Sequence, residues 1–372
     1  MKVALVHDDL IQFGGAERVL MAMHELWPDA PIYTTSASKK WKQKCKKEGI
    51  GLKTSFMQRL PFVEKLNRYY SPFLLHILAF ESFDFSEYDL VISSSTRFAH
   101  GITTKPGTKH ICYMNSPGRM FWEPNNYFEK ESYGFLKPIK ALAKPFLSLP
   151  LSHIRQWDFI AAQRVDHFIA NSKLPKERIK KYYGRDSKII YPFVDYERFV
   201  SLKSKDENYF VVLTRLASWK KVEIAIEVCN NLGKQLYVLG GGPDLGRLKK
   251  LAAPTVKVLG HVSDKSREKI LAGCTAVIVT QKEDFGIVPL EAMATGKPVI
   301  AYGAGGVLET VIEGETGLFF KEQTAEALEV VMKGFKTSAF NSEKCKKQAK
   351  LFEKSVFLNE LKAFVSDLND SL

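Results

Sequence analysis

Short apolar runs alternate with helical segments along the N-terminal half of the chain, and polar residues follow most of these runs. Runs rich in valine, isoleucine and leucine are typical of strands buried in a parallel sheet. The runs are Lys2–Val6, Asp89–Ser93, Lys109–Tyr113, Asp166–Ala170 and Lys188–Tyr191. Strands that alternate with helices predict an α/β fold.

The same alternation restarts after a polar segment. Pro192–Phe199 and Ser201–Asn208 are typical of a linker. The apolar runs beyond it are Tyr209–Leu213, Gln235–Leu239, Thr255–Leu259, Ala276–Thr280 and Pro298–Ala301. We therefore predict two doubly wound domains, which the length of 372 residues allows. The end of the chain, Cys345–Leu372, is predicted to be helical.

Residues 121–160 contain no predicted strand. Proline removes a helical N–H donor and interrupts a helix. We expect loops over Phe121–Pro124 and Tyr127–Lys130. An apolar basic helix is expected over Leu136–Leu149, broken by Pro138, Pro145 and Pro150. A further helix is expected over Ile154–Val165. This region would line a substrate groove or touch a membrane.

The segment Glu283–Glu291 carries the densest candidate chemistry of the chain. Glu283 lies just past the carboxyl end of a predicted strand, where parallel sheets bind their ligands. Gly286 and Pro289 mark a turn into a helix, and Gly296-Lys297-Pro298 ends that helix.

This segment suits a ligand with hydroxyl groups at both ends and phosphate between them, as in a sugar nucleotide. Glu283 and Glu291 would accept hydrogen bonds from hydroxyl groups. An anion is favoured by the backbone N–H groups at the helix N-terminus, from Phe285, Gly286, Ile287 and Val288. Alternatively, Glu291 caps its helix and Glu283 is a solvated loop acid, which is the better explanation for either glutamate alone.

Gly14 and Gly15 follow the first predicted strand and precede a predicted helix, Arg18–Leu26. Strand, glycine loop and helix in this order are typical of a phosphate-binding turn. A tight turn without a ligand is the alternative explanation for two glycines.

Five motifs join these residues in one pattern. They are Gly14–Glu17, Thr214–Lys220, Glu283–Glu291, Ala301–Glu309 and Glu313–Leu318. In this order they resemble the motifs of family 4 glycosyltransferases, which are retaining enzymes with the GT-B fold. The resemblance implies two Rossmann-like domains facing across a cleft, with residues 1–192 binding the acceptor and residues 193–350 binding the nucleotide-sugar donor. Residues 351–372 would form a helix that packs back on the N-terminal domain.

The resemblance also implies roles for single residues. Arg215 and Lys220 match positions that hold the donor diphosphate, where cations stabilise the charge of the leaving group. Glu283 would orient the sugar hydroxyls and Glu291 would accept the ribose hydroxyls, while Gly14 and Gly15 would face the donor phosphates. His261 lies where the family often meets the base or ribose, and a loop histidine without a role is the alternative.

Asn115 departs from the family pattern, because many members have a histidine at this position near the sugar. Asparagine hydrogen-bonds a hydroxyl group but does not act as a base at neutral pH. A reaction in which the donor phosphate takes the acceptor proton does not need the histidine. A turn residue before Ser116-Pro117 is the alternative. The predicted catalytic residues are thus Glu283, Arg215, Lys220 and Asn115.

The formal net charge of +13 predicts an anionic partner. Nucleic acid is not expected, because the chain has no RNA- or DNA-binding motif. Lysine is dense in one stretch, at Lys39, Lys40, Lys42, Lys44, Lys46 and Lys47. Phe56–Tyr70 and Ser71–Phe80 then mix aromatic, aliphatic and cationic residues. Two interpretations stay open: a segment that lies on an anionic membrane, and helices that pack on the core.

The five cysteines are scattered and form no C-x-x-C pair, which predicts reduced thiols and no zinc site. The chain begins directly with a strand pattern, and no apolar run reaches the roughly 20 residues of a spanning helix. We therefore expect a cytoplasmic protein, peripheral on the inner face of the membrane. No D-x-D motif is present, and GT-B enzymes typically need no bound metal, so neither a metal nor another cofactor is expected.

The predicted function is that of a retaining glycosyltransferase in surface polysaccharide or lipopolysaccharide assembly. It would move a hexose to a lipid-linked or polysaccharide acceptor. The N-terminal pattern resembles mannosyltransferases, so GDP-mannose is the first choice of donor. The alternatives are a nucleotide-sugar epimerase or a phosphorylase with the same fold, and a non-catalytic sugar-nucleotide-binding protein.

Overall fold

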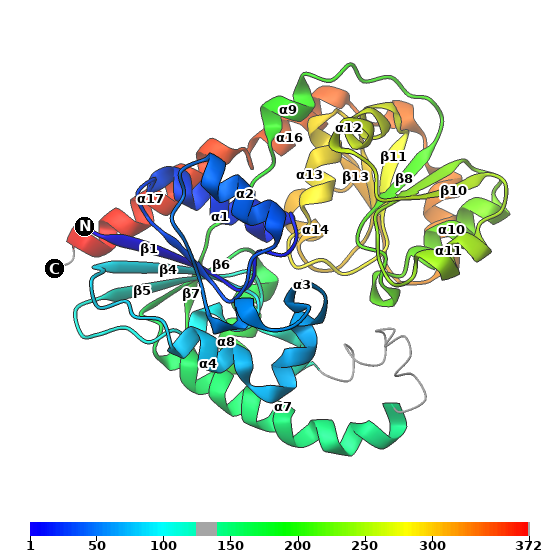
Figure 1. Ribbon diagram of the computed structural model, residues 1–372. Coiled ribbons are helices and arrows are strands. Elements are labelled where there is room, and N and C mark those ends of the chain that lie inside the picture. Colours follow the sequence, from blue (N-terminus) through cyan, green and yellow to red (C-terminus); the bar gives the residue numbers. More distant parts are fainter. Residues whose placement is uncertain (124–139, 371–372) are drawn as a thin grey trace. The chain divides into compact units, whose positions relative to one another are not determined.

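The computed structural model describes residues 1–123 and 140–370, which divide into two α/β units (Figure 1). Of these residues, the first unit contains 1–123, 140–191 and 358–370, and the second contains 192–357. The chain thus enters the second unit after residue 191 and leaves it after residue 357, where the sequence prediction had 192 and 350. Each unit has one parallel sheet.

The sheet of the first unit has the strand order β3-β2-β1-β4-β5-β6-β7. Its strands are β1 (Val3–His7), β2 (Ile32–Thr34), β3 (Leu52–Thr54), β4 (Leu90–Ser95), β5 (Lys109–Met114), β6 (His167–Ala170) and β7 (Ser187–Ile189). From β1 the chain builds one half of the sheet and then returns to β4 on the other side. The carboxyl ends of β1 and β4 therefore form a topological switch point, the place where such sheets bind ligands.

Helices cover both faces of this sheet, with α1 and α17 on one face and α4, α7 and α8 on the other (Figure 1). The helices are α1 (Gly15–Leu26), α2 (Lys39–Lys47), α3 (Val63–Leu66), α4 (Leu75–Glu81), α5 (Arg119–Trp122), α7 (Lys140–Gln163), α8 (Lys173–Tyr183) and α17 (Lys354–Asp370), with 3-10 turns η1 (Phe56–Arg59), η2 (Asn67–Phe73) and η3 (Ala99–Gly101). Buried aromatic residues, among them Phe80, Phe98 and Phe121, pack on the β1 and β4 side chains. This core therefore holds β1 and β4, the two strands of the switch point, in place.

Helix α17 belongs to the first unit from Leu358 onward. The ring of Phe364 lies 6.2 Å from that of His167 at the start of β6, and Lys188 Nζ lies 5.4 Å from the Phe364 ring. Lys109 Nζ at the start of β5 donates a hydrogen bond to the Leu368 carbonyl. The helix therefore crosses the amino ends of the strands, away from the switch point.

The sheet of the second unit has the order β10-β9-β8-β11-β12-β13, with its switch point between β8 and β11. Its strands are β8 (Phe210–Leu213), β9 (Leu236–Leu239), β10 (Val256–Gly260), β11 (Ala276–Val279), β12 (Val299–Tyr302) and β13 (Gly317–Phe320). Its helices are α9 (Tyr196–Val200), α10 (Val222–Asn231), α11 (Leu245–Leu251), α12 (Asp264–Gly273), α13 (Ile287–Ala294), α14 (Val307–Thr310), α15 (Ala325–Gly334) and α16 (Ser342–Lys350), with 3-10 turns η5 (Ser218–Lys220) and η6 (Thr337–Ala339).

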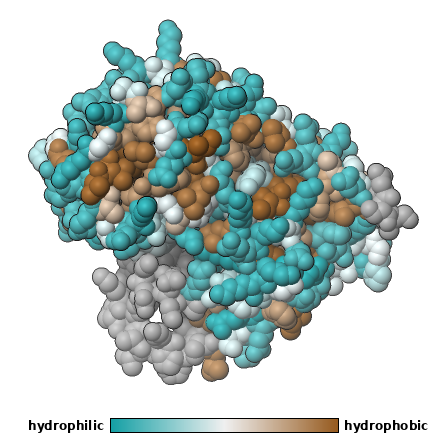
Figure 2. Space-filling model, turned by 180° about the vertical axis from the view of Figure 1, so that it is seen from behind, coloured by the Kyte–Doolittle hydropathy of each residue, from teal (hydrophilic) through white to brown (hydrophobic). Residues whose placement is uncertain are grey.

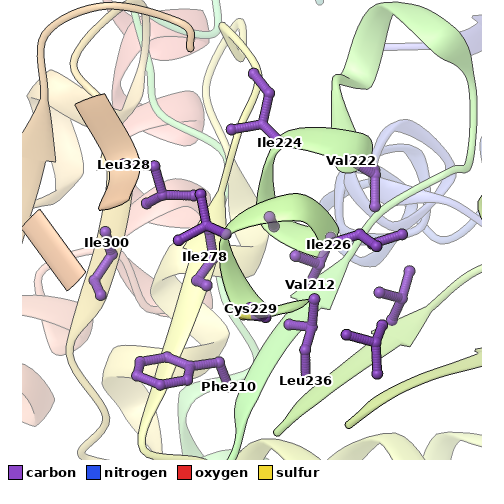
Figure 3. Packing of buried hydrophobic residues seen from close by; sticks show 14 of the residues in the cluster. Phe210, Val212, Val222, Ile224, Ile226, Cys229, Leu236, Ile278, Ile300 and Leu328 are labelled. Atoms are coloured by element: carbon purple, nitrogen blue, oxygen red, sulfur yellow. The ribbon is translucent and has the colours of Figure 1, made fainter. Parts of the chain in front are cut away.

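Alternate residues of the strands build the core of this unit (Figure 3). Phe210 and Val212 of β8 point to the same face, because side chains alternate along a strand. Val222 and Ile226, one helical turn apart on α10, meet them there. Leu328 of α15 closes the cluster, so one face of the sheet is sealed by α10 and α15.

The structure confirms the predicted α/β alternation, but several local predictions were wrong. Pro145 and Pro150 do not break a helix, since both lie inside α7. A helix of this length tolerates the loss of two N–H bonds because the other bonds hold it. Phe121 lies in the short helix α5, not in a loop. The predictions over Pro124, Tyr127–Lys130 and Leu136–Pro138 fall outside the described residues.

The C-terminal prediction was also too simple, and three strands were missed. Cys345–Leu372 is not one helix: α16 ends at Lys350 and α17 begins at Lys354. Between them, the Phe352 carbonyl accepts a hydrogen bond from Val194 N at 2.9 Å, so the chain bends onto the linker. The missed strands β2, β3 and β13 are Ile32–Thr34, Leu52–Thr54 and Gly317–Phe320, and each lies in a stretch without a run of branched aliphatic residues like those that marked the predicted strands.

Candidate functional site

Lys220 and Glu283 meet at the switch point of the second unit. Lys220 ends the η5 turn after β8, and Glu283 follows β11. Lys220 Nζ lies 2.7 Å from Glu283 Oε1 and 4.2 Å from the centroid of the Trp219 ring. Gln281 Nε2 donates to the same carboxylate oxygen. Since Lys220 is only 7% exposed, its ammonium group is fixed by a carboxylate and an aromatic face.

The glycine loop after β12 supports the Glu283 segment. Gly306 N donates to the Glu283 carbonyl at 2.9 Å, and Glu283 pairs with Gly305 in a parallel bridge. A Cβ atom on Gly306 would lie 2.3 Å from the Phe285 Cα atom. Only glycine allows this close approach, so the loop after β12 sets the position of the Glu283 backbone.

Helix α13 begins at Ile287, shortly after Glu283 in the chain. Gly286 precedes it with a φ of 94°, a conformation that favours glycine. The Phe285 side chain is buried against Phe352, with ring centroids 5.7 Å apart. The half-buried Ile287 and Val288 form the first turn, whose N–H groups have no partner within the helix. The predicted anion-favouring amides therefore lie at a helix N-terminus.

Glu291 lies one turn further along α13 and is 1% exposed. Its Oε1 atom lies 3.4 Å from Nη1 of Arg267, a residue of α12. Glu291 therefore lies too far inside α13 to cap its start, and Glu283, which pairs with Lys220, is not a solvated loop acid. Arg267 was not predicted from the sequence, because it stands among other charged residues on a polar helix.

Arg215 and His261 lie on loops at the same edge of the sheet, and both are exposed. The glycine loop after β9 packs on the Arg215 loop: a Cβ atom on Gly240 would lie 1.8 Å from the Thr214 carbonyl oxygen. Gly240 N also donates to Gly260 O at 2.8 Å, next to His261. The loops after β8, β9 and β10 are therefore tied together at the carboxyl edge of the second sheet.

Gly14 and Gly15 belong to the first unit, at the start of α1. Gly14 N donates to Glu17 Oε2 at 2.8 Å, and a Cβ atom on Gly14 would lie 2.9 Å from that oxygen. Burial raises the pKa of Glu17, although the nearby His7 opposes the shift. The structure thus gives Gly14 a role in the turn, and the predicted phosphate contact stays a prediction.

Asn115 lies at the carboxyl end of β5 and is half-buried. Its side-chain Nδ2 donates to Ser94 Oγ at 3.2 Å, and its backbone N–H donates to Ser95 O at 2.8 Å. Ser116, the next residue, accepts a hydrogen bond from Arg178 at 3.0 Å. Asn115 is therefore held on the ligand-binding edge of the first sheet.

Asp8 joins the loops after β1 and β4 at the switch point of the first unit. Its carboxylate accepts hydrogen bonds from the backbone N–H groups of Thr96 (2.6 Å), Phe98 (2.8 Å) and Ala99 (2.8 Å). Burial alone would raise the pKa of Asp8, but the charges of Arg97 and His7 and the hydrogen bonds outweigh it, so the pKa is lowered. This carboxylate orders the edge that also holds Asn115.

Two negative findings hold for the described residues. Within residues 1–123 and 140–370, no group of three or more His, Cys, Asp or Glu side chains is placed to hold a metal ion. In the same residues no helix combines the length and apolarity that crossing a membrane requires. The expected independence of metals and cofactors stays a prediction.

Residues 194–352 match the protein family described as glycosyl transferases group 1. The alpha-1,3/1,6-mannosyltransferase alg2 of Schizosaccharomyces pombe is 25% identical over 85% of this chain and 70% of that protein. The corresponding protein of Kluyveromyces lactis is 24% identical over 84% and 71%. An uncharacterized glycosyltransferase of Methanocaldococcus jannaschii is 24% identical over 72% of this chain and 81% of its own length.

Solved structures show the same architecture. Sucrose-phosphate synthase of Thermosynechococcus elongatus matches with a TM-score of 0.74 and 14% identity over 100% of both chains. Anabaena HepE in complex with UDP and glucose matches with a TM-score of 0.71 and 19% identity over 98% of this chain and 99% of that one. These similarities confirm the fold as GT-B, with two Rossmann-like domains.

Proposed function

We propose that this chain, a glycosyltransferase with a group 1 domain over residues 194–352, is a retaining hexosyltransferase whose second unit binds a nucleotide-sugar donor and whose first unit binds the acceptor. The observation that carries the proposal is the Lys220–Glu283 pair. It brings a fixed cation and a hydroxyl acceptor to the switch point of the second sheet.

Lys220 would stabilise the leaving group. Cleavage of a sugar–phosphate bond leaves negative charge on the diphosphate, and a preorganised cation lowers that barrier. Lys220 is already held in place by Glu283 and Trp219, so little reorganisation is needed. Arg215, exposed on the loop after β8, would add a bidentate contact to the same phosphates.

Glu283 and Glu291 would bind different parts of the donor. Glu283, at the carboxyl end of β11, would accept hydrogen bonds from sugar hydroxyls. Glu291, buried on α13, would accept those of the ribose. The N–H groups at the start of α13 lie between the two glutamates along the chain, which suits a phosphate group there. His261 would contact the base or the ribose.

Asn115 supports a mechanism without a protein base. Its amide is held by Ser94 and Ser95 and would hydrogen-bond a sugar hydroxyl. The donor phosphate would take the proton from the acceptor hydroxyl as the new bond forms on the face that the leaving group vacates. Retention of the anomeric configuration follows from that geometry.

Mannose from GDP-mannose is the proposed donor sugar. The support is the similarity to two alpha-1,3/1,6-mannosyltransferases over more than four-fifths of this chain. The HepE structure contains UDP and glucose, so UDP-glucose is the donor to compare with it. Neither a bound metal nor another cofactor is part of the proposal, because side-chain cations and helix N-termini would take the place of Mg²⁺.

The acceptor is proposed to be lipid-linked, or a polysaccharide at an anionic membrane surface. The support is two sets of exposed residues in the first unit: the lysines Lys39, Lys40, Lys42, Lys46 and Lys47 of α2, and the apolar residues Phe62, Phe73 and Leu78 of the segments that follow it in the chain. Buried Trp41, Met57 and Phe80 show that these segments pack on the core in part, and a membrane contact of their exposed residues is the proposal. Figure 2 shows apolar residues among hydrophilic ones on one face of the molecule.

The test is calorimetric titration of GDP, UDP and ADP, followed by transfer of labelled sugar from the matching donor. Selective binding of GDP that weakens in Lys220→Ala is the expected result. Equal binding of all three nucleotides, or none, would contradict the proposed donor. An isomerised sugar nucleotide in the absence of acceptor would indicate an epimerase instead.

A further inference from the structure

Phe13 is an exposed aromatic residue on the loop after β1, directly before the Gly14–Gly15 turn. It is 55% exposed. Single exposed apolar residues are common on protein surfaces and need no function. Phe13 differs from them in two respects. Its ring is held in place, and it follows a strand at the carboxyl edge of the first sheet, where such sheets bind ligands.

The ring of Phe13 is held by Trp41 of α2. The two ring centroids lie 4.3 Å apart and the ring planes differ by 13°, so the rings are stacked. Trp41 is only 1% exposed, and its Nε1 atom donates to the Gln12 carbonyl at 2.7 Å. Because Gln12 directly precedes Phe13, the indole group holds both the phenyl ring and the backbone beside it. One face of the Phe13 ring is thus covered, and the exposed area belongs to the other face and the ring edge.

The backbone on either side of Phe13 is also anchored. Leu10 forms a parallel bridge with Ala37, which follows β2. On the other side, Gly14 N donates to Glu17 Oε2 at 2.8 Å. The ring therefore lies between two anchored segments, and a ligand that packs on it would not have to order it first.

The other residues at this edge of the sheet are polar. Asp9, after β1, pairs with Arg97, after β4, and accepts a hydrogen bond from Asn67 at 3.0 Å. Asn115 lies at the carboxyl end of β5. A fixed apolar ring among charged and amide side chains suits a molecule with an apolar face and a rim of hydroxyl groups. A sugar ring has this structure, because axial C–H bonds gather on one face. A lipid chain would instead suit a continuous apolar surface.

We propose that the open face of Phe13 is a platform on which a sugar ring of the acceptor stacks. This inference rests on the proposed function, in which the first unit binds the acceptor. The face of an aromatic ring carries partial negative charge and attracts the partial positive charge of C–H groups. This contact needs a flat ring, so tyrosine would serve in place of Phe13 and leucine would not.

The test is saturation-transfer NMR on the whole chain, with methyl α-D-mannopyranoside as the probe. The wild type is expected to bind the probe, with saturation concentrated on the C–H protons of one face of the sugar. Phe13→Leu is expected to bind it about tenfold more weakly, since a single aromatic contact is of that order. Phe13→Tyr is expected to bind it as the wild type does.

Phe159→Leu is the matched control, because it makes the same exchange of side chains in the same unit. Phe159 is 44% exposed and lies near the end of α7, where the chain approaches the amino end of β6. It is therefore not part of the carboxyl edge. Phe159→Leu is expected to keep the wild-type affinity for the probe.

The inference is overturned if Phe13→Leu binds the glycoside as tightly as the wild type, or if Phe159→Leu loses as much affinity. Farnesyl phosphate is the second probe. If its binding depends on Phe13 more than that of the glycoside does, the ring contacts a lipid chain and the sugar platform is wrong. Should Phe13→Leu fail to fold, Phe13→Met decides in its place, because it is also apolar and lacks a ring.

Calorimetric titration of GDP separates this inference from the proposed function. A wild type that binds GDP but no glycoside overturns the inference alone. A wild type that binds neither removes the proposed function as well. The Phe13 variants are expected to bind GDP as the wild type does, because the donor is assigned to the second unit.

Discussion

Lys220 Nζ and Glu283 Oε1 lie 2.7 Å apart although 63 positions separate the two residues in the chain. The contact joins the loop after β8 to the loop after β11, the two strands at the switch point of the second sheet. Thr280 strengthens the link, because its hydroxyl group donates to the Lys220 carbonyl at 2.7 Å. A cation and an acid are thus fixed together on the edge where open α/β sheets bind ligands.

Replacement of Lys220 by alanine is expected to lower kcat for sugar transfer about 10²–10³-fold, since it removes a preorganised charge that faces the leaving diphosphate. Steady-state kinetics with GDP-mannose as donor measures the effect. Lys221→Ala is the control, because Lys221 is the adjacent lysine and lies 3.8 Å from Glu223 instead. Equal losses in the two variants would show that general charge, not the position of Lys220, matters.

Gly306→Ala is expected to destabilise the second unit by about 1–3 kcal/mol, as overpacked sites commonly do. The new Cβ atom would lie 2.3 Å from the Phe285 Cα atom, so the Glu283–Phe285 loop must move. Urea unfolding measures the stability, and transfer activity should fall with it. Gly241→Ala serves as the control, because nothing lies within 4 Å of its added Cβ atom. A fully stable and active Gly306→Ala variant would contradict the close approach of the two loops.

Much of the second unit follows from the sequence, because polar residues stand directly after apolar runs. Lys220, Glu283 and His261 each follow a predicted strand, and parallel strands bring such residues to one edge. The structure adds that the glycine loop after β12 positions the Glu283 backbone.

Other features have no local signal in the sequence. Arg267 is one of several charged residues on α12, and nothing in its spacing relates it to Glu291. The hydrogen bonds to Asp8 come from residues about 90 positions away, so only the packing of β1 beside β4 shows them. Helix α7 continues through Pro145 and Pro150 although propensity alone predicts a break.

Asp8→Asn is expected to lower the free energy of unfolding by about 2–3 kcal/mol at pH 7, because the amide offers a poorer acceptor to the N–H groups that surround it. The pKa of Asp8 is lowered in the folded protein, so the unfolded chain binds the proton more readily. The stabilisation is therefore full above the ordinary Asp pKa of about 3.9 and is lost as the pH falls through the lower folded value.

Urea unfolding of the wild type and Asp8→Asn between pH 7 and pH 3 measures this dependence. The difference in stability should be constant near neutral pH and should shrink in the acid range. Asp186→Asn is the control, since its side chain is 88% exposed and pairs with a surface lysine. A difference that stays constant down to pH 3 would mean that Asp8 is not the titrating group.

Phe62 and Phe73 are 75% and 71% exposed on the first unit, near the lysine-rich helix α2 in sequence. Lysines near an anionic surface contribute about 1 kcal/mol each, and salt screens that attraction. The protein is therefore expected to float with phosphatidylglycerol vesicles at low salt and to float less at 0.5 M salt, a level of about three times physiological ionic strength. The double variant Phe62→Ser and Phe73→Ser should float less than the wild type at either salt concentration.

Val330→Ser is the control for this double variant, because Val330 is 72% exposed but belongs to α15 of the second unit. Its flotation should equal that of the wild type. If the double variant also floats like the wild type, lysines alone account for the attraction. If the wild type stays out of the floated fraction at both salt concentrations, the exposed aromatic residues serve another partner, and the proposal of a lipid-linked acceptor at the membrane loses its support.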